Sequence, residues 1–170
     1  MKKTQELTIA AMSLALGIIL PQAFHMVPNA GNIFLPMHIP ILICGFLVSP
    51  LYAFLVGVLC PIVSHFVFQM PPTIMLGQMI VELSIYGLST SLLSKVIHIK
   101  SDYLRTYIIL ILSMLIGRIC YGLMNYLFFK AGSYSLEIWL SAAFISSLPG
   151  ILIQLILIPM LVVNAKKITK

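Results

Sequence analysis

Two ionisable side chains, Glu82 and Arg118, lie in the middle of long apolar stretches. A charge inside hydrocarbon costs on the order of 3 kcal/mol by insertion scales, so each must face protein or water. At about 1.5 Å per helical residue, Glu82 would lie roughly 12 Å and Arg118 roughly 16 Å below the same end of two consecutive helices. Similar depth predicts that the two charges either line a cavity together or form an ion pair that only locks two helices. Both can hold, because a partly paired guanidinium can still bind a ligand carboxylate.

Each charge belongs to a set of polar residues spaced three or four apart, which places the set on one helix face. The first set is Gln78, Glu82, Tyr86 and Ser89, and the second is Arg118, Tyr121, Gly122 and Asn125. Two such faces opening toward one end predict the walls of a binding cavity. We therefore take as candidate ligand-binding residues the two charges with Gln78, Tyr86, Tyr121 and Asn125, and add His38 and Asn32 near the expected opening.

Metal binding and catalysis are not expected. The histidines nearest the opening, His25, His38 and His65, offer neither an i, i+4 pair nor a matching carboxylate. The three cysteines lie inside apolar stretches and have no C-x-x-C spacing. The sequence also contains no phosphate-binding loop, no H-E-x-x-H and no G-x-S-x-G. We expect neither an enzyme nor a bound cofactor.

The composition indicates that these residues are held by membrane helices. Of 170 residues, 61% are hydrophobic and 8% are charged, whereas a soluble domain carries about 25% charged residues. A spanning helix needs about 20 apolar residues, so the chain has room for about six. The fold class we expect is all-α, with residues 1–170 forming a single six-helix membrane domain.

Six apolar segments can be delimited in the sequence, at 7–26, 36–50, 52–69, 74–94, 105–129 and 137–163. Prolines bracket the second, so a short or broken helix is expected there. The uncharged connection 27–35 is either a lid over the opening or a plain turn.

The basic residues orient the chain in the membrane. Eight of the ten fall at the N-terminus, in the fourth connection and at the C-terminus, and Lys130 is the one basic residue on the opposite side. Positive charge marks the cytoplasmic side, so both termini are predicted to be cytoplasmic. Because topology explains the basic excess, we expect no nucleic-acid partner.

Small residues mark one face of the first segment. Ala11 and Ala15 lie four apart, a spacing that lets helices approach closely in lipid. The face could serve internal packing or the docking of a partner protein.

Several motifs resemble the substrate-binding S component of energy-coupling factor (ECF) vitamin transporters. Residues 35–45 read L-P-M-H-I-P-I-L-I-C-G, similar to the family's L-P-x-H-x-P-x-L-x-x-G second helix. Further similar positions are Pro50 to Pro61 with Gly57, residues 69–72, Gly117-Arg118 and Pro149-Gly150. The resemblance covers the chain from Ala10 to Pro159.

This resemblance implies a multi-pass protein of the bacterial cell membrane that binds a vitamin at its outer face. The implied partners are a small-molecule vitamin, the lipid bilayer, and a module of one transmembrane coupling protein and two ATPase subunits. The family's A-x-x-x-A docking motif matches Ala11 and Ala15, which favours the docking interpretation. Inward transport would follow toppling of the S component in the membrane.

The substrate depends on whether Arg118 is free. If Glu82 does not neutralise it, an anionic vitamin fits, with pantothenate first and lipoate and folate behind it. If the two residues pair fully, a neutral ligand such as pyridoxine is favoured. Two other classes remain open: a stand-alone proton-coupled carrier that uses Glu82, and a non-transporting membrane scaffold.

Overall fold

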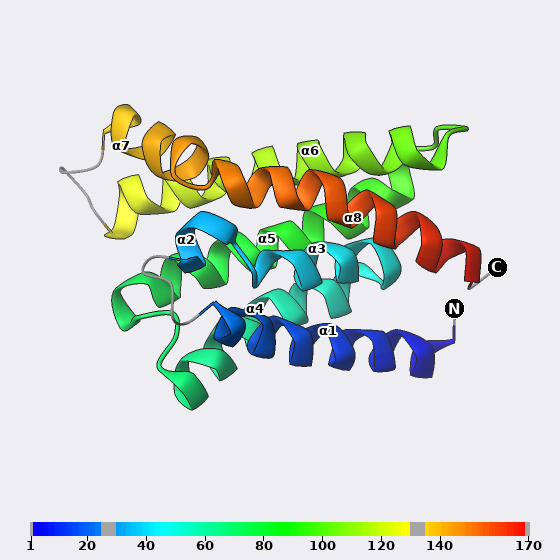
Figure 1. Cartoon of the computed structure of the whole chain (residues 1–170), viewed down its shortest axis with the longest axis horizontal. Coiled ribbons are helices and arrows are strands. Elements are labelled where there is room, and N and C mark those ends of the chain that lie inside the picture. The colour runs from blue at the N-terminus through cyan, green and yellow to red at the C-terminus, as the bar shows by residue number, and fades with distance from the viewer. Residues whose placement is uncertain (1, 25–29, 130–134, 169–170) are drawn as a thin grey trace.

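The computed structural model describes residues 2–24, 30–129 and 135–168, and these form helices joined by short connections, with no strand among them. Figure 1 shows the arrangement. The helices are α1 (Lys3–Ala23), α2 (Ala30–Phe34), α3 (His38–Leu47), α4 (Pro50–Phe68), α5 (Thr73–Val96), α6 (Asp102–Met124), α7 (Leu136–Leu140) and α8 (Leu148–Ile168). A π-helical turn, Asn125–Phe129, extends α6, and a second, Ser141–Ile145, follows α7. The predicted all-α class is confirmed.

Five helices in the described residues are long and apolar enough to cross a membrane. They are Lys3–Ala23, Pro50–Phe68, Thr73–Val96, Asp102–Phe128 and Leu148–Ala165. Each predicted apolar segment is helical, but the number of full-length spans differs from the six expected. The second segment gives only the ten-residue α3, since the chain turns at Pro36 and Met37 before it and bends at Val48 after it. The last segment is interrupted just before α8.

Residues at the helix ends explain where several helices begin. Ser49 precedes Pro50, which occupies the first turn of α4, where a missing N–H is harmless. The Ser101 hydroxyl accepts a hydrogen bond from the backbone N–H of Leu104 at the start of α6, and Ser135 does the same for Ile138 in α7. Local polar residues thus set the helix boundaries in an otherwise apolar chain.

Helix α5 is the centre of the bundle and packs against α3, α4 and α6. Close approach to α4 depends on glycine: a Cβ on Gly57 would meet the backbone of Leu83 and Ser84, and one on Gly87 would meet the backbone of Ala53. Helix α1 packs against α3 and α4, and α8 packs against α2, α3 and α6. The stripe of polar residues on α5 therefore lies inside the protein.

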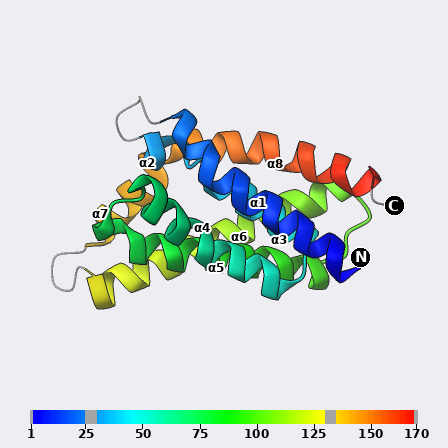
Figure 2. The same cartoon turned by 90° about the horizontal axis from the view of Figure 1, so that it is seen from below.

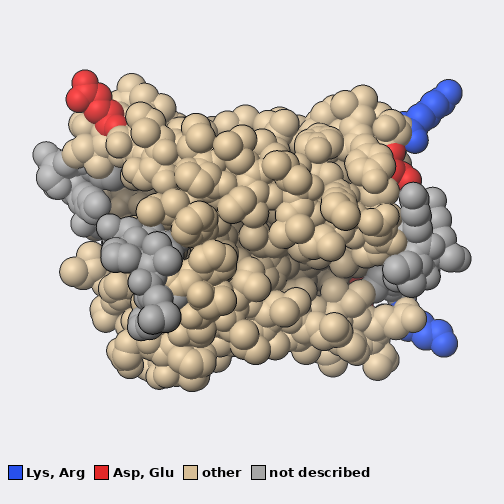
Figure 3. All heavy atoms as spheres, in the orientation of Figure 1, with Lys and Arg blue, Asp and Glu red and all other residues tan. Residues whose placement is uncertain are grey.

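Both ends of the described chain lie at one end of the bundle, as Figures 1 and 2 show. On the face drawn in Figure 3, Lys and Arg side chains gather at that same end. The predicted placement of the termini on one side is confirmed, and the charge rule assigns that side to the cytoplasm. Lys130 lies outside the described residues, and the side chains of the basic residues after Ala165 do as well.

Polar contacts brace the cytoplasmic end. The backbone N–H of Ser49 donates to Glu6 Oε2 at 3.1 Å, joining α1 to the start of α4. The Arg105 side chain donates to the carbonyls of Ile97 (2.8 Å) and Ser94. These carbonyls lie at the C-terminal end of α5, where a positive charge is favourable. The opposite end holds the cavity described next.

Candidate ligand-binding cavity

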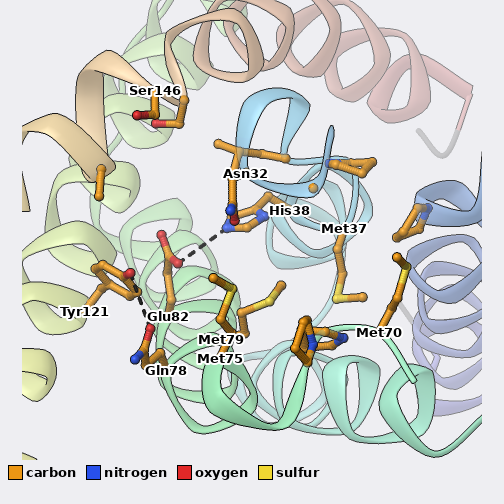
Figure 4. Close-up of a pocket in the computed structure, with 18 of the residues that line it drawn as sticks. Asn32, Met37, His38, Met70, Met75, Gln78, Met79, Glu82, Tyr121 and Ser146 are labelled. Carbon is orange, nitrogen blue, oxygen red and sulfur yellow. Dashed lines mark hydrogen bonds and ion pairs between the residues drawn. The ribbon is translucent and has the colours of Figure 1, made fainter. Parts of the chain in front are cut away.

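A cavity of about 460 Å³ opens at the end of the bundle opposite the termini. The ends of α1, α2, α3, α5 and α6 and the residues before α8 form its wall. Figure 4 shows Tyr121, Gln78 and Glu82 on one side of the view and Met37 and Met70 on the other. The cavity therefore has a polar end and an apolar end.

Glu82 contacts three other side chains at the polar end of the cavity. Its Oε1 lies 3.7 Å from Arg118 Nε and accepts a hydrogen bond of 3.1 Å from the Tyr86 hydroxyl. Its Oε2 lies 3.6 Å from His38 Nε2. The predicted contact between Glu82 and Arg118 is thus present, and His38, from the start of α3, completes the cluster.

Arg118 and His38 each carry buried nitrogens that make no hydrogen bond to the described residues. Within the described structure, Nε and Nη2 of Arg118 and both ring nitrogens of His38 lack a hydrogen-bond partner. Arg118 is 4% exposed and His38 is 2% exposed, so both side chains are largely removed from water. The hydrogen bonds to water that these nitrogens lose on burial are not replaced by hydrogen bonds to the described residues. A buried cation with unsatisfied donors at a cavity wall is suited to bind an anion.

The rest of the polar wall is held in place by hydrogen bonds. The Tyr121 hydroxyl donates to Gln78 Oε1 at 3.4 Å. The side-chain amide of Asn125 donates to the Tyr121 carbonyl at 2.9 Å, and the Trp139 indole N–H donates to the Arg118 carbonyl at 3.0 Å. These bonds tie the outer end of α6 to α5 and α7.

The structure brings most of the predicted residues together. Six line the cavity: Asn32, His38, Gln78, Glu82, Arg118 and Tyr121. Tyr86 and Asn125 do not line it; both are fully buried, and each holds a lining residue in place. The helical spacing placed them on the correct face, but it could not separate the wall of the cavity from the layer behind it.

Tyr86 lies behind the wall because Gly117 leaves it space. A Cβ on Gly117 would collide with the Tyr86 ring. The ring therefore fits against α6 one turn below Glu82, with its hydroxyl pointing back to the carboxylate.

Sequence reasoning missed the apolar wall, which contains four methionines: Met37, Met70, Met75 and Met79. Methionine is flexible and polarisable, and is common at surfaces that adapt to apolar ligands. The spacing of Met75 and Met79, one turn apart and in register with Gln78 and Glu82, was a usable signal. In a sequence this apolar, such residues do not stand out.

The predicted lid is only partly described. Of the connection 27–35, residues 27–29 lie outside the described residues, as does His25. Residues 30–34 form α2, and Asn32 and Leu35 line the cavity.

Nowhere in the described residues do three side chains of the His, Cys, Asp or Glu type lie close enough together to hold a metal ion.

The two faces of α1 have separate environments. Ala10, Ser13 and Gly17 are buried, and a Cβ on Gly17 would contact Cys60 Sγ at 2.5 Å. Ala11 and Ala15 are exposed, between exposed side chains such as Met12 (61%) and Leu16 (51%). Internal packing thus uses the other small residues and leaves the Ala11–Ala15 face outward.

Comparison with known families agrees with this geometry. A family model described as the substrate-specific component of ECF transporters matches residues 5–162. The chain belongs to this family. It is a membrane-embedded component that binds the substrate for an ECF transporter and works with an ECF module. No curated protein and no solved structure gave a match.

Proposed function

We propose that this S component captures a small, water-soluble vitamin or vitamin precursor that carries a carboxylate. The observation that carries the proposal is the guanidinium of Arg118, which is buried at the cavity wall with two nitrogens lacking acceptors in the described structure. A ligand carboxylate would supply those acceptors. Pantothenate is the first candidate, followed by lipoate and folate; pyridoxine, which has no carboxylate, is the neutral alternative.

The loose contact between Arg118 and Glu82 favours an anionic ligand over a neutral one. Their closest nitrogen and oxygen are 3.7 Å apart, beyond hydrogen-bond distance. A full pair would have satisfied the guanidinium and left a cavity suited to pyridoxine. As it stands, Glu82 holds Arg118 in place and leaves donors for the ligand.

The size and lining of the cavity reduce the number of candidate ligands further. A volume of about 460 Å³ is near the lower end of the roughly 300–1,000 Å³ range of small-molecule sites, which favours pantothenate and lipoate over folate. The methionine wall suits an apolar body. The ligand expected is therefore a compact molecule with a carboxylate at one end and apolar groups toward the other, such as the gem-dimethyl group of pantothenate or the dithiolane ring of lipoate.

Delivery into the cell would follow docking on an ATP-driven module of one coupling protein and two ATPase subunits in the bacterial plasma membrane. The outward Ala11–Ala15 face supports this step, because small exposed residues let a partner helix approach closely. The cavity and the docking face lie on separate parts of the molecule, so binding and docking can be tested separately.

The proposal is tested by ligand-induced thermal stabilisation. The purified protein is heated with pantothenate, lipoate, pyridoxine or folate, and the midpoint is followed as a function of ligand concentration. A ligand at about 100 times its Kd should add about 2.7 kcal/mol of stability. Stabilisation by a carboxylate vitamin supports the proposal; stabilisation by pyridoxine alone contradicts it.

A further inference from the structure

The cavity has a charge balance that an anionic ligand would upset; this inference therefore rests on the proposed carboxylate ligand. Glu82 and Arg118 are the described lining residues that carry fixed opposite charges, and together they are neutral. Adding a carboxylate would leave one net negative charge in a site where Glu82 and Arg118 are at most 5% exposed. An uncompensated buried charge is strongly unfavourable.

His38 is placed to supply the missing positive charge. Its Nε2 faces Glu82 Oε2 at 3.6 Å, whereas Arg118 lies beside the other oxygen, Oε1. Neither ring nitrogen has a hydrogen-bond partner among the described residues, so a second N–H can be added without breaking a bond. Histidine is also the side chain that ordinarily changes charge near neutral pH.

Few ionisable groups face His38. Helix α5 contributes Glu82 and Tyr86, whose ring centroid lies 5.4 Å from the imidazole, and helix α6 contributes Arg118. Among the described residues of the other helices packed on α3, Glu6 of α1 bonds Ser49 at the far end, and His65 of α4 bonds the Pro71 carbonyl at 2.7 Å. The described side chains of α8 include no acidic or basic residue.

We infer that capture of a carboxylate ligand by this cavity takes up one proton from solvent at His38. The imidazole becomes an imidazolium whose Nε2–H donates to Glu82 Oε2. Glu82 is then balanced by His38, and Arg118 is released to bind the ligand carboxylate. The occupied site is neutral, with two negative and two positive groups.

The inference predicts a definite pH dependence. Because the bound state holds one more proton than the free state, affinity falls as pH rises, by up to about tenfold per pH unit, and it levels off at low pH, where the free site already holds that proton.

The proton is counted by isothermal titration calorimetry. Pantothenate, and separately lipoate, is titrated into the detergent-solubilised full chain in phosphate, HEPES and Tris buffers at pH 6.5, 7.5 and 8.5. The slope of the observed enthalpy against the ionisation enthalpy of the buffer gives the number of protons taken up. We expect a slope that rises toward one with pH, and a slope near zero in His38→Gln.

Two further variants complete the test. Glu82→Gln should also have a slope near zero while still binding, since Arg118 alone then neutralises the ligand; it serves if His38→Gln fails to fold. His98→Gln, in the exposed cytoplasmic connection, should keep the wild-type slope. Ligand binding with a zero slope in the wild type, or an unchanged slope in His38→Gln, overturns the inference. If neither carboxylate binds at any pH, the proposed function fails, and this inference fails with it.

Discussion

Arg118 and Glu82 form a buried pair at the cavity wall, and we propose that they combine a structural role with a binding role. Glu82 accepts a hydrogen bond from Tyr86 and faces both His38 and Arg118, so it is close to saturated. Arg118 keeps unsatisfied donors at the cavity wall. The asymmetry predicts that neutralising the two residues has separable effects on stability and on ligand binding.

Replacing Arg118 with Gln should harm both properties. It leaves Glu82 buried without the fixed positive charge beside it, which costs about 3–5 kcal/mol, and it removes the expected ligand contact. The double variant Glu82→Gln with Arg118→Gln should recover most of the thermal stability, because no unpaired charge remains, but should still bind a carboxylate vitamin at least about tenfold more weakly than the wild type. Recovery of full affinity in the double variant would show that the pair is only a structural lock.

Sequence patterns could predict the charged residues of the site, but not its apolar side. Glu82 and Arg118 are exceptional inside apolar segments, so depth and helical spacing were sufficient to bring them together. Met37 and Met79 are typical of such segments, and nothing local distinguishes a cavity-lining methionine from a lipid-facing one. His38 was included on position alone; its contact with Glu82 depends on how α3 packs against α5.

At the scale of the helices, close packing between α5 and α6 sets the position of Glu82. Gly117 admits the Tyr86 ring, and Tyr86 in turn holds Glu82. Gly117→Ala should force the ring to shift, lowering stability by about 1–3 kcal/mol, as overpacking does. It should also weaken ligand binding, although the residue does not line the cavity.

The measurements for this variant are the thermal midpoint and the ligand Kd. Ile119→Ala, two residues along α6, is the matched control, since Ile119 is 57% exposed on the outer face. The control should retain wild-type affinity. A Gly117→Ala protein with unchanged affinity would show that Tyr86 does not position Glu82.

Substitutions on the outward face of helix α1 should impair docking on the partner without changing ligand binding. Ala11→Trp or Ala15→Trp puts a large side chain on the outward face, so vitamin uptake in cells should be abolished while the ligand Kd of the purified protein is unchanged. Ile156→Trp, on the exposed face of α8, is the control and should keep both properties. Uptake that survives both alanine substitutions would exclude this face as the docking site.

The helices themselves were predictable from apolar segments, and their breaks only in part. Prolines at both ends of the second segment indicated a short α3, which the structure confirms. The interruption before α8 was not foreseen, because residues 137–163 read as one apolar run without a charge after Glu137. The local signal was Ser146-Ser147 before Pro149-Gly150, since serine, proline and glycine together favour a turn and a new helix start.

At the scale of the whole molecule, the chain is the substrate-specific component of an ECF transporter, and we propose that it depends on a partner for energy. We expect proteoliposomes that contain only this protein to show no vitamin uptake under a pH gradient. Uptake should appear when the coupling protein, both ATPase subunits and ATP are added. Flux driven by the pH gradient alone would instead support a stand-alone proton-coupled carrier that uses Glu82.

The most direct test of the central claim is a native mass spectrum of the protein purified from its own cells. We predict a bound small molecule whose mass matches a carboxylate vitamin, pantothenate first, and its absence from the double variant Glu82→Gln with Arg118→Gln. A bound neutral vitamin such as pyridoxine, or an empty protein that no carboxylate vitamin converts to a bound species, would contradict the account.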